Sequence, residues 1–89
     1  MARKFYFTYG TDGQPFYGGW SEVVADDQGK AIKAYTAYHP MKNGLLNCCT
    51  VYSEEAFRNT SMYKNGKNFG FGLQERITLI REAGDGEED

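Results

Sequence analysis

Hydrophobic and polar residues alternate at the start of the chain. Within residues 3–9, every second position carries an aromatic ring, at Phe5, Phe7 and Tyr9. This period of two predicts a half-buried β-strand. A second run of β-branched and aromatic residues at positions 20–25 predicts another strand, so residues 10–19 join the two as a hairpin connection. That connection is longer than the roughly two to five residues of a plain hairpin loop, which suggests a function for it.

The pattern then changes to a helical period. Asp26 and Asp27 are suitable caps for a helix start, and Pro40 stops the run that follows. Apolar residues recur at helical spacing between these limits. We expect three of them to form a stripe that packs on the sheet: Ala31, Tyr35 and Tyr38.

The second half of the chain repeats the change of period. Residues 45–52 are apolar on both faces, which predicts a central strand. Ser53 is expected to cap a short helix that buries Phe57 and ends near Thr60. Residues 74–82 close the domain as a strand, with Ile77 and Leu79 on one face and Ile80 on the other.

The predicted order of elements is β-β-α-β-α-β. It implies an α+β fold in which a small, mostly antiparallel sheet carries its two helices on one face. The 89 residues suffice for one small domain, which we assign to residues 1–83. Residues 84–89 contain no apolar side chain and four acidic ones, so they are expected to form a disordered acidic tail.

Charge is unevenly distributed along the chain. The net charge is −2, but without the four tail acids ten basic and eight acidic residues remain, a charge of +2. Residues 30–67 carry six basic and two acidic side chains. Such a basic body permits an anionic ligand, although it is far from the pI above about 9 of a dedicated nucleic-acid binder. A solvated lysine surface explains the same pattern.

Residues for catalysis or metal binding are scarce. Cys48 and Cys49 are adjacent, so a disulfide between them needs strained geometry and reduced thiols are expected. The single histidine, His39, is at a helix end before proline, a capping or solvent-facing position, and is a poor partner base for either thiol. These three residues lack the spacing and the fourth ligand of a zinc site. No phosphate-binding glycine motif precedes a helix, and we expect no enzyme activity, no metal and no cofactor.

Glycine and aromatic residues gather in two segments, residues 10–19 and 62–72. Glycine permits close backbone approach, and aromatic rings supply stiff contact surface, so the two segments suit a recognition surface at one end of the sheet. Trp20 is expected to be a buried anchor. The alternative is that these rings cover a thin core. The candidate binding residues are Tyr9, Phe16, Tyr17, Arg58, Tyr63, Lys64, Lys67, Phe69 and Phe71.

Several segments together resemble a family of small, largely uncharacterised proteins encoded by phages and conjugative elements of gut bacteria. The resemblance spans about residues 4–77 and is strongest over residues 52–70. Its segments include Phe5-Tyr6-Phe7-Thr8-Tyr9-Gly10, Gly19-Trp20-Ser21-Glu22-Val23, His39-Pro40, Gly44-Leu45-Leu46-Asn47-Cys48, Val51-Tyr52-Ser53-Glu54-Glu55-Ala56-Phe57, Thr60-Ser61-Met62-Tyr63 and Gly66-Lys67-Asn68-Phe69-Gly70. Such proteins often carry Cys-His-Glu where this chain has Leu73-Gln74-Glu75, so a metal or nucleophile role for that triplet does not carry over.

The resemblance implies an accessory protein of a mobile element. One hypothesis is therefore a non-enzymatic protein that inhibits a host defence protein by direct contact, as anti-CRISPR proteins do. A second is a sponge that sequesters a nucleotide-type immune signal, and an interaction domain unrelated to defence is a third. A hydrolase or transferase lacks a convincing site. No apolar run is long enough to cross a membrane and no signal-peptide core is present, so we expect a cytoplasmic protein of a bacterial host, with direct nucleic-acid binding disfavoured.

Overall fold

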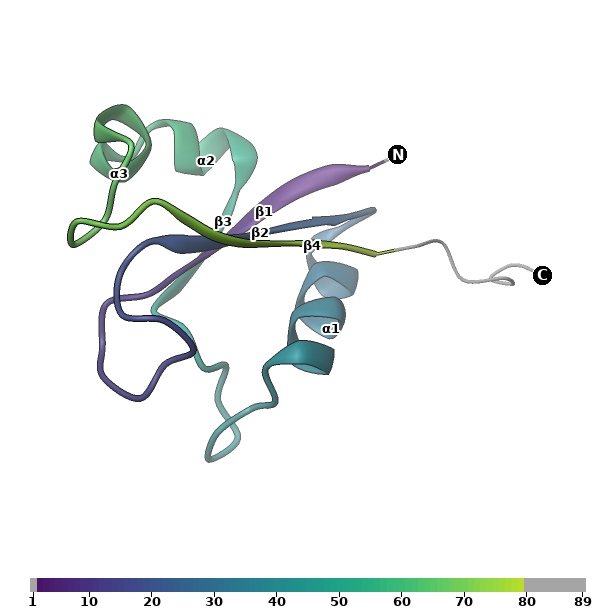
Figure 1. Ribbon diagram of the computed structural model, residues 1–89. Helices are drawn as coiled ribbons and strands as arrows, with labels where there is room; N and C mark the ends of the chain where they lie inside the picture. The colour runs from purple at the N-terminus through teal and green to yellow at the C-terminus, as the bar shows by residue number, and fades with distance from the viewer. Residues whose placement is uncertain (1, 80–89) are drawn as a thin grey trace.

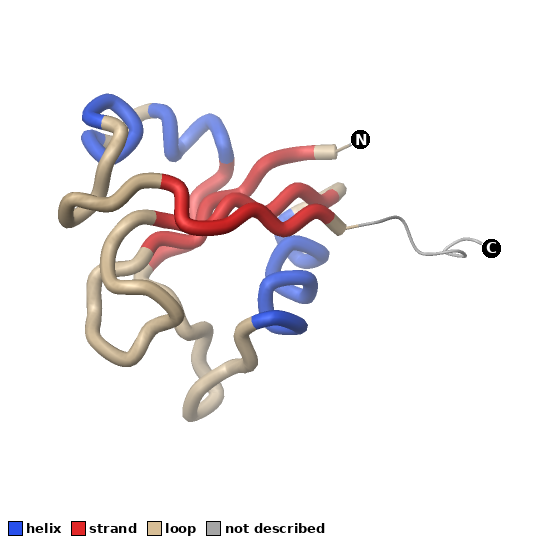
Figure 2. Tube along the Cα trace, in the orientation of Figure 1, coloured by secondary structure: helices blue, strands red, loops and turns tan. Residues whose placement is uncertain are grey.

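The computed structural model describes residues 2–79, which form a four-stranded sheet with helices on both of its faces (Figures 1 and 2). The order along the chain is β1 (Arg3–Thr8), β2 (Trp20–Ala25), α1 (Gln28–Tyr38), β3 (Thr50–Ser53), α2 (Glu54–Arg58), α3 (Ser61–Asn65) and β4 (Leu73–Thr78). The α+β class is confirmed. The predicted acidic tail and Ile80 lie outside the described residues.

Across the sheet the strands lie in the order β3-β1-β2-β4. The pairs β1–β2 and β1–β3 are antiparallel, whereas β2 and β4 run parallel, with an irregularity at Trp20 and Ser21. The sheet is therefore mostly antiparallel, as predicted, with one parallel edge strand.

The prediction that both helices lie on one face is wrong. Helix α1 covers the face that carries Phe5, Phe7 and Val23, and the ring of Phe7 stacks on Tyr35 at 4.2 Å. Helix α2 covers the opposite face, where Tyr6 stacks on Phe57 at 4.3 Å. Figure 1 shows α1 below the sheet and α2 and α3 above it. Strand β1 has aromatic rings on both faces, so each face needs cover.

The strand predicted at residues 45–52 is also corrected. Only Thr50–Ser53 is a strand, and it lies at the sheet edge rather than the centre. Leu45 is 70% exposed in a turn, while Leu46 and Cys48 pack against the core from a loop. Apolar side chains in this segment reach the core from a loop without joining the sheet, and β3 is an edge strand because β4 pairs with β2 instead.

Helix boundaries follow local capping. The side chain of Asp27 accepts from the Lys30 amide, and Ser53 caps α2 in the same way. Thr60, expected near the end of α2, instead caps a further helix, α3. In α1 the predicted stripe holds for Ala31 and Tyr35, which are buried, whereas Tyr38 is exposed.

Candidate functional site

The two glycine and aromatic segments meet beside the start of β2. The Gly19 amide donates to the Asn68 carbonyl at 2.8 Å. The Asn68 side-chain amide donates to the carbonyls of Tyr9, at 2.6 Å, and Gly19, at 3.1 Å. The sequence suggested this meeting, and the structure confirms it. We call residues 10–19 the first loop and residues 66–72 the second loop; residues 62–65 of the predicted segment belong to helix α3.

The second loop contains a tight turn whose backbone is unusual for its residues. Asn68 and Phe71 exchange two backbone hydrogen bonds, and both residues between them have positive φ, 53° at Phe69 and 84° at Gly70. Positive φ at both central positions defines a type I′ turn, which prefers Asn-Gly. Phenylalanine rarely adopts this conformation, because its Cβ crowds the backbone.

Three aromatic side chains form an exposed group over the loops. Tyr17, Phe69 and Phe71 are 51%, 62% and 49% exposed, and the rings of Tyr17 and Phe69 are 5.8 Å apart. A Cβ at Gly18 would be 2.8 Å from the Phe71 ring and from the Asn68 carbonyl oxygen, so the glycine permits this packing. We call these three side chains the aromatic patch.

The remaining candidates of the second half surround this region or lie on α2. Tyr63, 48% exposed, packs edge-on against Phe57. Lys64 and Lys67 are exposed, on α3 and in the second loop. Arg58 is not in either loop. It lies on α2, where its guanidinium donates to Glu54 at 2.9 Å and lines an open hollow of about 380 Å³ with Glu55 and Asn59.

Two sequence candidates from the first half are wholly or partly covered by the core. Tyr9 is 1% exposed, and Phe16 is half-buried with its ring 5.4 Å from that of Tyr9. Tyr9 continues the alternation of β1, so its ring points to the face that α1 covers. It therefore lies in the core beneath the first loop.

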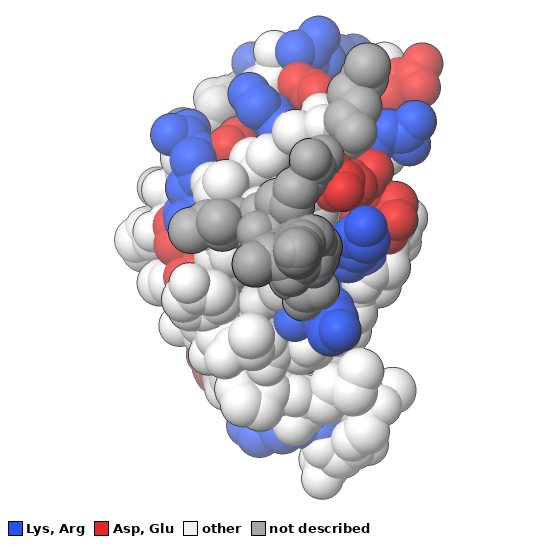
Figure 3. Space-filling model, turned by 90° about the vertical axis from the view of Figure 1, so that its right-hand side faces the viewer, with Lys and Arg blue, Asp and Glu red and all other residues white. Residues whose placement is uncertain are grey.

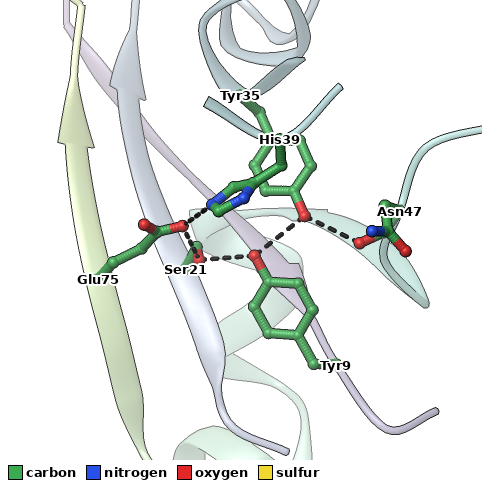
Figure 4. Close-up of polar contacts among 6 residues, drawn as sticks. All are labelled: Tyr9, Ser21, Tyr35, His39, Asn47 and Glu75. Carbon is green, nitrogen blue, oxygen red and sulfur yellow. Dashed lines mark hydrogen bonds and ion pairs between the residues drawn. The ribbon is translucent and has the colours of Figure 1, made fainter. Parts of the chain in front are cut away.

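A buried polar network surrounds Tyr9 (Figure 4). Its hydroxyl lies 2.6 Å from Ser21 Oγ and 3.0 Å from the Tyr35 hydroxyl, which donates to the Asn47 carbonyl. Ser21 Oγ also donates to Glu75 Oε1 at 2.8 Å. These contacts join the end of β1 to β2, α1, β4 and the segment before β3. The network therefore stabilises the part of the core that lies beneath the loops.

His39 completes this network at the end of α1. Its backbone amide donates to the Tyr35 carbonyl, and its ring Nε2 is 2.5 Å from Glu75 Oε1. The predicted capping role is confirmed, but the side chain is only 20% exposed. Sequence reasoning missed the network. The available signal was two polar residues, Ser21 and Glu75, at alternate strand positions that otherwise face the core.

Burial raises the pKa of three side chains in this core, Tyr9, Tyr35 and Cys48. Burial raises the pKa of Tyr9 to about 12 and raises that of Tyr35 further. Burial, with the neighbouring Cys49, raises the pKa of the Cys48 thiol to about 11, the opposite of what a nucleophilic thiolate needs. Both cysteines are free thiols, as expected. The arrangement links the end of α1 to three strands and so helps to order the fold.

Within residues 2–79, no three His, Cys, Asp or Glu side chains are grouped as metal ligands would be. Over the same residues, no helix has both the length and the apolar character needed to span a membrane. No protein-family model matches the chain, and neither a curated protein nor a solved structure matches it.

Proposed function

We propose that this protein acts by binding: it is a non-enzymatic accessory protein of a phage or mobile element that inhibits a host defence protein by direct contact in the bacterial cytoplasm. The observation that carries the proposal is the aromatic patch of Tyr17, Phe69 and Phe71, exposed on two loops that hydrogen bonds hold together. The assignment to mobile elements and to counter-defence rests on the family resemblance.

The patch has the properties of a protein-binding surface. Rigid aromatic side chains give large contact area and lose little conformational entropy on binding, and they are enriched at energetically dominant positions of interfaces. Grouped exposed rings leave apolar area in water, which a partner removes. The loop backbone beneath the rings is fixed by Asn68 before any partner arrives, so binding does not have to order it.

A nucleotide sponge has less support. A phosphate needs unpaired cationic or amide donors around it. The hollow on α2 combines one guanidinium, Arg58, with two carboxylates, Glu54 and Glu55, and Glu54 already accepts from Arg58. The exposed Lys64 and Lys67 remain as cations for an anionic ligand, so the nucleotide ligand is kept as an outcome of the experiment.

Phage plating on a host that carries an active defence system tests the proposal. The chain is expressed in that host, and its protection of a sensitive phage is compared for two double variants. Tyr17→Ser with Phe71→Ser removes most of the patch, whereas Tyr38→Ser with Leu45→Ser alters two side chains that are even more exposed and lie outside it. Plating is expected to fall at least tenfold for the first variant and to be unchanged for the second.

Circular dichroism confirms that both variants are folded, and calorimetric titration with a panel of cyclic and linear nucleotides checks the sponge. If the parent protein binds a nucleotide and the patch variant does not, the ligand of the patch is a small molecule and not a protein. Full protection by the patch variant would contradict the proposed surface.

A further inference from the structure

Phe69 occupies a turn position at which phenylalanine is disfavoured. With φ of 53° it adopts the left-handed conformation at the first central residue of a type I′ turn, where asparagine is preferred. Its side chain is 62% exposed, so burial in the protein's own core does not account for the residue. A sparsely populated backbone conformation that is held at an exposed site points to a function for that side chain.

The surrounding structure holds Phe69 in place. A Cβ at Gly10 would lie 2.8 Å from Phe69 Cε2, so the ring rests directly on the Gly10 backbone. The side chain of the preceding residue, Asn68, is bonded to two carbonyls of the first loop and first strand end. The ring is thus presented in one arrangement while most of its surface remains open, as an interface anchor requires.

The charge of the surrounding segment indicates the partner. Between Glu55 and Glu75 the chain contains three basic residues, Arg58, Lys64 and Lys67, and no acidic residue. In contrast, the face that Figure 3 shows, on the opposite side from the loops in Figure 1, carries acidic and basic side chains next to one another. Lys67 belongs to the second loop and Lys64 to the helix before it, and both are exposed, so they pair best with carboxylates on a complementary surface.

We propose that Phe69 is an anchor that inserts into an apolar pocket of a partner protein, and that carboxylates line the rim of this pocket. Tyr17 and Phe71 pack on the rim, and Lys64 and Lys67 face the carboxylates. This inference rests on the proposed function and names the chemistry of the partner. A nucleic acid fits less well, because Arg58 is already paired with Glu54 and a polyanion is normally bound by many more phosphate contacts than Lys64 and Lys67 can supply.

Site-specific photo-cross-linking tests the anchor. The photoreactive residue p-benzoylphenylalanine replaces Phe69 in the full chain, which is expressed in the defended host and irradiated. A matched protein carries the same residue in place of Tyr38, which is 66% exposed and outside the patch. We expect a covalent product with one protein from position 69 only, and mass spectrometry is expected to place the bond on an apolar residue that has Asp or Glu neighbours in the partner.

Charge reversal tests the rim. Lys64→Glu combined with Lys67→Glu is expected to lower the yield of that product at least tenfold. Lys30→Glu combined with Lys33→Glu, on α1 across the sheet, is expected to change it less than twofold. Equal yields from positions 69 and 38, a product with a second copy of the chain or with nucleic acid, no product at all, or no loss on reversal of Lys64 and Lys67 would each overturn the inference.

The Phe69→Asn variant separates this inference from the proposed function. Asparagine suits this turn position, so the melting temperature is expected to stay close to that of the parent. The substitution removes the aromatic anchor, so protection in the plating assay is expected to fall at least tenfold. If Phe69→Asn retains protection and Tyr17→Ser with Phe71→Ser loses it, the patch binds without Phe69 and only the anchor is wrong. If both retain protection, the proposed function fails as well.

Discussion

Two turns of this protein have the same backbone conformation but differ in sequence. Residues 42–45 and residues 68–71 each close with two backbone hydrogen bonds, and the central residues have positive φ in both. The first uses Asn43-Gly44, the pair that such turns prefer, and the second uses Phe69-Gly70. The backbone geometry alone therefore does not explain a phenylalanine, and the difference lies in what each turn contacts.

The surroundings of the two turns are unlike. The turn at residues 42–45 projects from the domain, with Leu45 70% exposed and open space around Gly44. The turn at residues 68–71 is bonded to the first loop through Asn68, and Phe69 rests on Gly10. The first turn reverses the chain and contacts the first loop through the exposed Lys42 amine, whereas the second is bonded to the first loop through its backbone and a partly buried side chain and displays an aromatic ring.

Glycine substitutions at the two regions are expected to give the largest contrast. At Gly19, where the first loop meets the second, a Cβ would lie 2.2 Å from the Gly72 carbonyl oxygen, and φ is +71°. Gly19→Ala is expected to cost about 4 kcal/mol of unfolding free energy, from overpacking and left-handed strain together. Gly44→Ala meets open space and should cost about 1 kcal/mol. Urea unfolding measures both, and equal losses would contradict the close approach of the loops.

The first residue of each turn provides the next contrast. Asn68→Ala leaves two partly buried carbonyls, those of Tyr9 and Gly19, without a side-chain donor, so we expect a loss of about 2 kcal/mol. Lys42→Ala removes only an exposed contact with the Gly13 carbonyl and should change stability by less than about 0.5 kcal/mol. Thermal unfolding of both variants checks this, and a neutral Asn68→Ala would show that the loops do not depend on this side chain.

Exchanging the central residues compares the turns directly. Asn43→Phe places a bulky residue at φ of 56° in an exposed turn, at a cost of about 1 kcal/mol. Phe69→Asn relieves a similar strain but gives up the contacts with Gly10 and Tyr17, so the net change should stay within about 0.5 kcal/mol. Chemical denaturation of the two variants measures both changes in unfolding free energy. A loss above 1 kcal/mol in Phe69→Asn would mean that the ring serves the core.

The smallest expected effect concerns the base of the first loop at alkaline pH. Burial raises the pKa of Cys48 from 9.0 to about 11 and that of Tyr9 from 10.0 to about 12. Both groups ionise more readily in the unfolded chain, so their contribution is complete below pH 9 and is lost as pH rises through these ranges. We expect less than about 1 kcal/mol of loss from pH 8 to 9.5, by urea unfolding, and a shallower fall in Cys48→Ala. Stability that rises over this range would contradict the burial of these groups.

Local signals in the sequence were sufficient for most elements. The alternation of Phe5 and Phe7 identified β1, and the caps Asp27 and Ser53 identified the starts of α1 and α2. The exposure of Tyr17, Tyr63 and Phe69, the burial of Trp20 and the meeting of the loops also agree with the sequence analysis. These features depend on residues close together in the chain or on composition that admits few alternatives.

Long-range pairing decided the rest. Residues 45–52 have the composition of a central strand, yet β4 pairs with β2 and not with β3, so Thr50–Ser53 pair with β1 alone at the edge of the sheet. Tyr9 is a predicted binding residue, but its ring is buried in the core cluster that α1 covers. The bond between His39 and Glu75 joins residues 36 positions apart, and no local pattern specifies it.

The sequence by itself determined the α+β class, the two loops and their aromatic content, because periodicity, capping and glycine placement act over a few residues. Only the tertiary structure decided which aromatic rings became core and which became surface. Tyr9, Phe16 and Phe69 are all aromatic residues with glycines nearby in the chain. Their exposure differs, because the first two pack in the core on the α1 side of the sheet while the turn at residues 68–71 directs the third into solvent. That choice is set by packing across the sheet, which one-dimensional spacing does not encode.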